Sequence, residues 1–267
     1  MPQPLVSICT LTYNHERYIR DAIDSFLLQQ TTFPIEIVTH DDGSTDATQR
    51  IVDRYAAEHP ALIRSIVQPA NLYSQGVRGI LARFLLPHAT GKYIALCEGD
   101  DYWTDPRKLQ IQIDFLETHP EFAGSFHETQ VLNEDGTPGR VMGEKAPGIM
   151  TAADTFAMYS PFHTSSFVCR RDIGPMPDWI GEVVSADMAL FSIVAAKGAL
   201  WKAPGRMSVY RKTGPGITSL ATTTDRFHEQ RIALMQRLDQ FHGGRYAAQA
   251  RAVIAQHERA IAKTRTS

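Results

Sequence analysis

The stretch KYIALCEGDDYWTD, from Lys92 to Asp105, decides the fold of this chain. Its apolar run, Tyr93 to Cys97, is short and unbroken, which predicts a strand buried on both faces of a parallel sheet. Three acids, Glu98, Asp100 and Asp101, follow at once. Two carboxylates about 4 Å apart repel by roughly 4 kcal/mol at an effective dielectric near 20. We therefore expect a cation there, and a divalent ion shared with nucleotide phosphates fits, because the strand ends of open α/β sheets bind such ligands.

Composition excludes several classes of protein. The 267 residues are 43% hydrophobic and 21% charged, as in an ordinary globular protein of one large or two small domains. A net charge of -2 argues against general nucleic-acid binding. Cys9, Cys97 and Cys169 lie far apart in apolar stretches, which favours reduced core thiols. With no secretory pattern and no apolar run of roughly 20 residues, we expect a cytoplasmic protein and leave peripheral membrane contact open.

Strand and helix patterns alternate before the opening stretch. Short apolar runs predict strands over residues 5–12, 35–39 and 63–68. Helical spacing predicts helices over 17–30, through Ile51 and Tyr55 to about His59, and through 80–85. A further helix is expected after Asp105 and Pro106. This order is typical of the nucleotide-binding half of a parallel α/β fold.

The second half has a different pattern. We expect strands over residues 123–132, 164–169 and 200–210, a surface loop over 140–148, and helices over 152–158 and 183–197. Thr151 and Asp154 resemble a capping box for the first of these helices. The tail from Asp225 is helical in composition and broken at Gly243-Gly244. Its basic residues indicate either a solvated helical face packed on the domain or a surface for a partner or an anionic membrane.

Four polar stretches fall where a mostly parallel sheet would place the carboxyl ends of its strands. They are Thr10 to Asn14, Asp41 to Asp46, Asn71 to Gly79, and Glu98 to Asp101. Each stretch alone is ordinary, since turns and solvated acids are common in loops. Their shared placement is what predicts a ligand site.

These residues resemble a known family. The order TLTYNHERYIRDAIDSFLLQ, HDDGSTDAT and GKYIALCEGDDYW resembles the family 2 nucleotide-sugar glycosyltransferases of the GT-A fold. The resemblance covers about residues 4–210, and HTSSFVCRRDIG, the stretch 184–190 and YRKTG look like that family's acceptor half.

The resemblance implies roles for the donor-side residues. Thr10, Thr12 and Tyr13 would line the base and ribose pocket, with Tyr13 stacking on a pyrimidine. Asp41 would accept a hydrogen bond from a ring N–H. The neighbouring Asn14 and Asp42 are further candidates for donor binding, and a UDP-sugar is the first expectation for the donor.

The resemblance also implies a metal site and phosphate contacts. Asp101 would be the principal ligand of a magnesium or manganese ion that bridges to the diphosphate, and Asp100 would contact the metal or the ribose. Glu98 stands where many relatives have Asp, so its direct ligation is in doubt. Arg78 and Arg211 could add charge-assisted phosphate contacts, or be surface arginines.

Glycosyl transfer needs a base that takes the proton of the acceptor hydroxyl. The resemblance places this base at Asp187, although Ala186 replaces the glutamate that precedes it in the family; the ordinary alternative is a first-turn residue that stabilises a helix dipole. His163 could face the same cleft, or be a structural histidine. Tyr102 and Trp103 could form a floor for a sugar ring, or pack in the core.

We thus expect an α/β chain with a mostly parallel central sheet flanked by helices. One GT-A-like domain spans 1–220, with a donor half over 1–105 and an acceptor half over 106–220, and a helical extension spans 221–267. The implied reaction is metal-dependent transfer, with inversion, to a glycan, lipid-linked or protein acceptor. The alternatives are a sugar-phosphate nucleotidyltransferase, which the stretch TLTYNHERY disfavours because it lacks a glycine-rich phosphate loop, and a domain that binds without turnover.

Overall fold

A computed structural model describes residues 3–183, 185–213 and 224–266 of the chain. Within them, ten strands form one mixed sheet in the order β3-β2-β1-β4-β9-β6-β10-β5, with β7 on β6 and β8 on β10. The strands are β1 (Val6–Thr12), β2 (Ile35–Asp41), β3 (Ile63–Val67), β4 (Tyr93–Leu96), β5 (Tyr102–Trp103), β6 (Phe122–Leu132), β7 (Pro138–Met142), β8 (Ile149–Met150), β9 (Val168–Arg170) and β10 (Ala199–Arg211).

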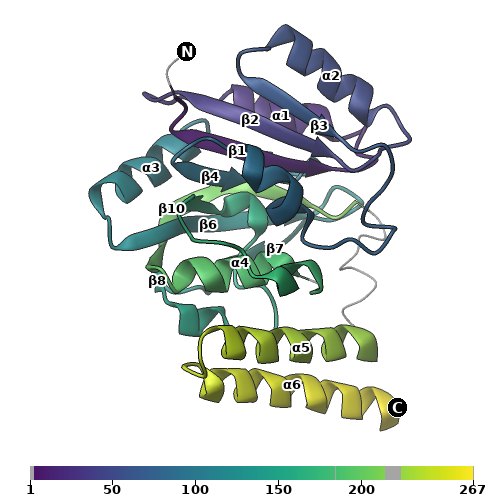
Figure 1. Cartoon of the computed structure of the whole chain (residues 1–267), viewed down its shortest axis with the longest axis vertical. Helices are drawn as coiled ribbons and strands as arrows, with labels where there is room; N and C mark the ends of the chain where they lie inside the picture. Colours follow the sequence, from purple (N-terminus) through teal and green to yellow (C-terminus); the bar gives the residue numbers. More distant parts are fainter. Residues whose placement is uncertain (1–2, 184, 214–223, 267) are drawn as a thin grey trace.

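The helices cover both faces of this sheet (Figure 1). They are α1 (Ile19–Leu27), α2 (Thr48–Glu58), α3 (Lys108–Thr118), α4 (Ala186–Ala195), α5 (Asp225–Phe241) and α6 (Ala247–Thr266). Short helical turns are η1 (Leu81–Leu85), η2 (Leu86–His88), η3 (Ala152–Thr155), η4 (Thr164–Ser166) and η5 (Asp178–Gly181). The apolar faces of α1, α2 and α3 pack into one core, and α4 packs into the other.

The first four strands of the sheet are parallel, as the alternating pattern predicted. β1 pairs with β2 on one side and with β4 on the other, and β3 extends β2. The chain order 3-2-1-4 reverses between β1 and β4, and open α/β sheets bind ligands at such a point, outside the carboxyl ends of the strands.

The second half of the chain differs in detail from the prediction. β9 runs antiparallel to both β4 and β6, so the sheet is mixed where it passes from one half to the other. Residues 164–166, expected in a strand, form the turn η4, in which Ser166 Oγ donates to His163 O. Residues 140–142, expected in a loop, belong to β7, which pairs with β6. The capping box at Thr151 and Asp154 is confirmed.

The tail forms a helical hairpin, α5 and α6, that lies beside α4 (Figure 1). The predicted break at Gly243-Gly244 is confirmed, since both glycines have positive φ between the two helices. Ala250 and Ile254 of α6 pack into the same cluster as α4 and α5. In the described part of the chain, no helix is long and apolar enough to cross a membrane. The predicted boundary at 220/221 falls in residues 214–223, which lie outside the described residues.

Candidate active site

The acids of the opening stretch lie over the end of β1. The Gly99 N–H donates to Leu11 O at 2.8 Å, so the loop after β4 runs directly against this strand. A Cβ on Gly99 would lie 2.8 Å from Thr12 Oγ1 and 2.9 Å from Ile19 Cδ1. Only glycine fits there without displacing a neighbour, and it brings Asp100 to the strand ends that the sequence predicted would form the site.

Asp41 and Asp101 share an unusual arrangement of their carboxylates. Each is 1% exposed. Asp41 Oδ1 accepts a hydrogen bond from Ser44 N at 2.7 Å, and Asp101 Oδ1 accepts one from Arg211 N at 2.9 Å. The Oδ2 atom of each residue is buried and has no hydrogen-bond partner among the described residues. One oxygen therefore holds the backbone, and the other can accept a hydrogen bond or a cation.

Thr10 and Thr12, at the end of β1, show the same lack of partners. Both side chains are buried, and neither Oγ1 atom has a hydrogen-bond partner in the described chain. Thr12 lies opposite Asp41 in the sheet, and since buried hydroxyls normally find a partner, a polar ligand is the simplest account of its free Oγ1. The adjacent Tyr13 is 39% exposed, which leaves its ring free to stack.

Asn14 and Asp42, also donor-binding candidates, hold the loops of this edge together. Asn14 has a φ of 54°, and its Oδ1 accepts from Thr45 N at 2.8 Å. Asp42 accepts from the backbone N–H groups of Leu72 and Tyr73 at 2.9 and 3.1 Å. Both carboxylate oxygens of Asp42 are thus occupied by the loop over residues 70–79.

The two candidate arginines differ in their surroundings. Arg211 is paired with Asp21, donates to Asp100 O at 3.2 Å, and lies over the Tyr102 ring at 4.3 Å. It therefore borders the acid cluster. Arg78 donates to Tyr73 O at 2.7 Å and to Val77 O at 3.0 Å, so its guanidinium folds back on its own loop.

Asp100 has two contacts that the sequence did not suggest. Its Oδ2 accepts from Thr213 Oγ1 at 3.1 Å and lies 3.7 Å from His15 Nε2. His15 belongs to the TYNHERY stretch after β1, and its position after a strand end was the feature that could have identified it. These contacts fix Asp100 beside Asp101.

His163 and Trp103 are mainly structural. His163 Nδ1 accepts from Ser165 N at 3.2 Å, and its ring stacks on Tyr210 with centroids 4.2 Å apart. Burial lowers the pKa of His163 to about 3, so it is neutral beside Asp101, whose Oδ2 lies 3.6 Å away. Trp103 is buried and donates to Ser165 O at 2.8 Å, which makes it part of the core and not an open sugar platform.

Asp187 lies in the first turn of α4, after Ser185 in the left-handed conformation with a φ of 72°. Burial raises the pKa of Asp187, and the charge of Arg231 opposes this shift. Glu98 is exposed to solvent, and its crowded surroundings, followed by the charges of Asp100 and Asp187, act to raise its pKa.

The acid residues fit a divalent cation that is shared with a ligand. Burial, followed by the charges of Asp100 and Glu98, raises the pKa of Asp101 well above its usual range. A cation would relieve this repulsion and use the buried Oδ2 of Asp101. Among the described residues no three His, Cys, Asp or Glu side chains converge as a complete metal cage. Magnesium commonly binds through one or two carboxylates and completes its shell with substrate phosphates and water, which agrees with this set.

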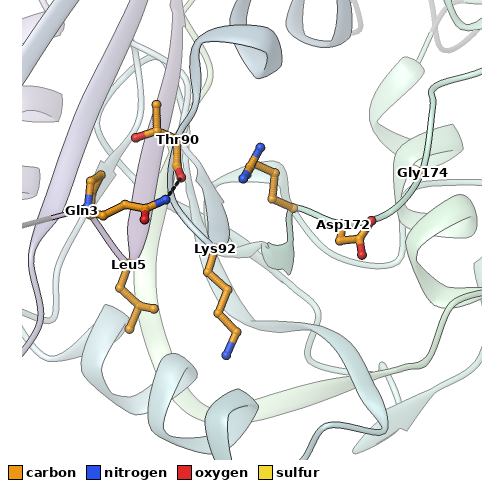
Figure 2. Close-up of a pocket in the computed structure, with 8 residues that line it drawn as sticks. Gln3, Leu5, Thr90, Lys92, Asp172 and Gly174 are labelled. Carbon is orange, nitrogen blue, oxygen red and sulfur yellow. Dashed lines mark hydrogen bonds between the residues drawn. The ribbon is translucent and has the colours of Figure 1, made fainter.

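Two surface hollows differ in their relation to this site. One, of about 520 Å³, borders it and is lined by Tyr13, Gly43 to Thr45, and residues 67–71. The other, of about 650 Å³, lies at the opposite ends of β1 and β4 (Figure 2). There Lys92 Nζ is paired with Glu117 at 2.6 Å, and Arg171 Nε donates to Gly91 O at 2.7 Å. Its cations already have partners, so we assign it no ligand.

Solved structures identify the class of this fold. The chain is similar to Staphylococcus aureus TarS residues 1–349, solved in complex with UDP-GlcNAc, with a TM-score of 0.69 and 21% identity over 96% of this chain and 72% of that one. It is also similar to the mannosyltransferase PcManGT from Pyrobaculum calidifontis, solved with GDP-Man and Mn2+, with a TM-score of 0.60 and 17% identity over 99% and 76% of the two chains. The architecture is that of the GT-A glycosyltransferases.

The family follows from the sequence comparisons. The model of glycosyl transferase family 2 matches residues 7–171, and the chain belongs to this family of glycosyltransferases. It is 39% identical over 249 residues to the uncharacterised protein Rv1520 of Mycobacterium tuberculosis, covering 90% of this chain and 70% of the relative. It is 37% identical over 158 residues to the putative glycosyltransferase EpsE of Bacillus subtilis, covering 57% and 54%.

A third relative has a more specific name. The chain is 36% identical over 118 residues to WfaP of Escherichia coli, a UDP-Glc:alpha-D-GlcNAc-diphosphoundecaprenol beta-1,3-glucosyltransferase, covering 44% and 43% of the two chains. EpsE and WfaP are matched over about half of their length. The resemblance seen in the strings TLTYNHERY, DDGSTD and GDDYW is thus confirmed at the level of the family.

Proposed function

We propose that this glycosyltransferase moves a sugar from a nucleoside diphosphate sugar to an acceptor hydroxyl, in a metal-dependent reaction that inverts the anomeric carbon. The proposal rests on the different surroundings of the two carboxylate oxygens in Asp41 and in Asp101. Each carboxylate uses one oxygen to hold the backbone at a strand end, and its buried second oxygen has no partner in the described residues. A nucleotide base at one and a cation with its diphosphate at the other would satisfy both.

The donor would bind across the end of β1. Asp41 Oδ2 would accept a hydrogen bond from a ring N–H of the base, with Tyr13 stacking on the ring and the hydroxyls of Thr10 and Thr12 near the base and ribose. Uracil offers such an N–H, so a UDP-sugar is the first candidate. The UDP-GlcNAc bound to TarS and the UDP-Glc in the name of WfaP support this choice.

The diphosphate would lie beside the acids after β4. Asp101, with Asp100 next to it, would hold a Mg2+ or Mn2+ ion, and Arg211 borders the same acids. When bound, the cation neutralises the charge that develops on the leaving diphosphate. The Mn2+ in the PcManGT complex supports a divalent ion. Arg78 would reach the phosphates only after leaving its present contacts with Tyr73 and Val77.

The chemical step would use Asp187 as the base. The acceptor oxygen attacks the anomeric carbon while Asp187 takes the hydroxyl proton. The bond between that carbon and the β-phosphate oxygen breaks, its electron pair stays on the oxygen, and the nucleoside diphosphate leaves. A single displacement of this kind inverts the anomeric centre. The charge of Asp187 already influences Glu98, which supports a position facing the donor side.

The acceptor would enter from the second half of the chain, residues 106–220, with the donor half over 1–105. A lipid-linked glycan is the first candidate acceptor, because WfaP is named for a diphosphoundecaprenol acceptor, and a role in cell-surface polysaccharide assembly follows from it. In this proposal the protein is cytoplasmic and approaches the membrane surface, where such an acceptor lies. Its exposed basic residues Arg245, Arg251 and Arg259 would make that contact.

The test is calorimetric titration of UDP, GDP and dTDP with and without Mn2+, followed by a screen of nucleotide sugars for release of the nucleoside diphosphate. We expect metal-dependent binding that Asp101→Ala abolishes. Asp187→Asn should bind UDP like the wild-type protein and lose nearly all turnover. Asp53→Asn, which changes an exposed acid on α2, is the matched control for both. Binding without any metal dependence would refute the metal site, and an active Asp187→Asn would remove Asp187 from the base role.

A further inference from the structure

The C-terminal hairpin packs against α4 (Figure 1). The cluster that joins them contains Met188, Ala189 and Ile193 from α4 and Leu234, Met235 and Leu238 from α5, all of them buried. Met188 follows Asp187 in the sequence, so this interface begins one residue from the proposed base. The extension that the sequence separated from the domain therefore shares an apolar core with it.

Arg231 is the charged residue of α5 at this interface. It is 5% exposed, its Nη1 contacts the sulfur of Met188, and its guanidinium lies 5.2 Å from the Phe227 ring. Its Nε is buried and has no hydrogen-bond partner among the described residues. A buried guanidinium without a paired anion is costly, by several kcal/mol on the usual scale. Arg231 forms no ion pair among the described residues, and the acid nearest along the chain to its Met188 contact is Asp187, whose charge acts on Arg231.

Among the described residues, the other charged and titratable groups around Arg231 and Asp187 are Glu98, Tyr159, His228 and His257. Glu98, from the loop after β4, faces Asp187, and Tyr159 faces Arg231. His257 of α6 also faces Arg231, and its Nδ1 lies 2.9 Å from Nδ1 of His228. Burial, followed by the charges of His228 and Arg231, lowers the pKa of His257 to about 4, so this histidine is neutral at pH 7.

We propose that Arg231 is a positioning residue for Asp187, and that the hairpin α5–α6 is therefore part of the catalytic site. The proposal rests on the function proposed above for Asp187. Arg231 favours the ionised carboxylate at the start of α4, while burial favours the neutral acid, which could not take a proton. A helix that the sequence assigned to an extension thus supplies the charge that this half-buried base requires.

The test measures the ionisation of Asp187 directly. Carbon-13 NMR of protein labelled at aspartate carboxyls gives the titration midpoints, and Asp187→Asn identifies the resonance. We expect Arg231→Gln and Arg231→Met to raise the midpoint of Asp187, and Arg231→Lys to keep it near the wild-type value. Arg226→Gln, which removes an exposed arginine from the same helix, should leave it unchanged. If Arg231→Gln does not fold, Arg231→Met replaces it in the test, because a methionine suits a position beside the Met188 sulfur.

A kinetic measurement separates positioning from a general structural role. In the release of UDP from UDP-GlcNAc with Mn2+, the ratio of the rate at pH 8 to that at pH 6 should rise in Arg231→Gln, because the loss of a nearby positive charge shifts the ionisation of Asp187 to higher pH. A structural role would lower both rates by the same factor. An unchanged midpoint, or a midpoint in Arg231→Lys as high as in the neutral variants, would overturn the proposal while Asp187 could still be the base. Full turnover in Asp187→Asn would instead refute the function on which it rests.

Discussion

Gly43 offers a sharp test of how the donor side is built. It has a φ of +71° in the turn after β2, and a Cβ added there would lie 2.5 Å from the carbonyl carbon of Ala70 and 2.7 Å from Asn71 N. Gly136 has a φ of +80°, but a Cβ would meet nothing within 4 Å. Alanine at either site costs about 1–2 kcal/mol for the left-handed conformation. Only Gly43→Ala adds a backbone clash, worth about 1–3 kcal/mol by analogy with overpacking.

Urea denaturation and nucleotide titration would measure both parts of this effect. We expect Gly43→Ala to lose about 2–5 kcal/mol of unfolding free energy, against about 1–2 kcal/mol for Gly136→Ala. The extra loss corresponds to a melting temperature lower by roughly 2–12 °C than that of the control. Since the displaced residues 70–71 line the hollow beside Tyr13, UDP binding should weaken in Gly43→Ala alone. Equal stability of the two variants would refute the close approach of the two loops.

Two further predictions concern buried charges. Burial lowers the pKa of Lys108 from 10.5 to about 7, so the unfolded chain binds more protons than the folded one between these pH values. The unfolding free energy should therefore rise with pH through this window, by up to about 1.4 kcal/mol per pH unit. In urea denaturation, Lys108→Met should lack this rise, and the same slope in the variant would contradict the assignment. Asp42→Ala should lose about 2–4 kcal/mol, because the N–H groups of Leu72 and Tyr73 lose a charged acceptor, whereas a loss below 1 kcal/mol would mean that this loop does not depend on Asp42.

The parts of the site that could be predicted are those that depend on strand ends. Asp41 and Asp101 follow short apolar runs, and parallel strands bring such residues to one edge of the sheet whatever the distance between them along the chain. Local pattern and one topological rule were enough to place these stretches, and the family resemblance singled out Asp41 and Asp101 within them. The same reasoning gave the first four strands, the capping box at Thr151 and the break at Gly243-Gly244.

The remaining features depend on contacts between distant residues. The loop contacts of Asp42 could not be predicted from the sequence, because they are made with N–H groups 30 and 31 residues away. Arg78 returns to its own loop, which no spacing predicts. Likewise, nothing in the pattern around Val168 indicates that β9 runs antiparallel to both of its neighbours. Arg231 lay in a tail that contains many basic residues, and only its burial against α4 sets it apart.

The divided carboxylate of Asp41 leads to a final prediction about the nucleotide base. In Asp41→Asn, the Ser44 N–H still needs an acceptor, so the amide should place its oxygen at the Oδ1 position and its NH2 group at the buried Oδ2 position. The reverse orientation would oppose two donors at Ser44 and cost about 1–3 kcal/mol. The Oδ2 position, which is proposed to accept a ring N–H in the wild-type protein, would then hold a hydrogen-bond donor.

That reversal should change which base binds. Uracil presents a donor at its N3 position and cytosine presents an acceptor, so UDP should lose about tenfold or more in affinity while CDP gains, with the fold unchanged because the contact with Ser44 survives. Titration of UDP and CDP into the wild-type protein and Asp41→Asn measures the exchange, and Asp53→Asn is the control for a lost carboxylate charge. Parallel weakening of both nucleotides would mean that Asp41 acts through its charge and not as a hydrogen-bond acceptor for the base.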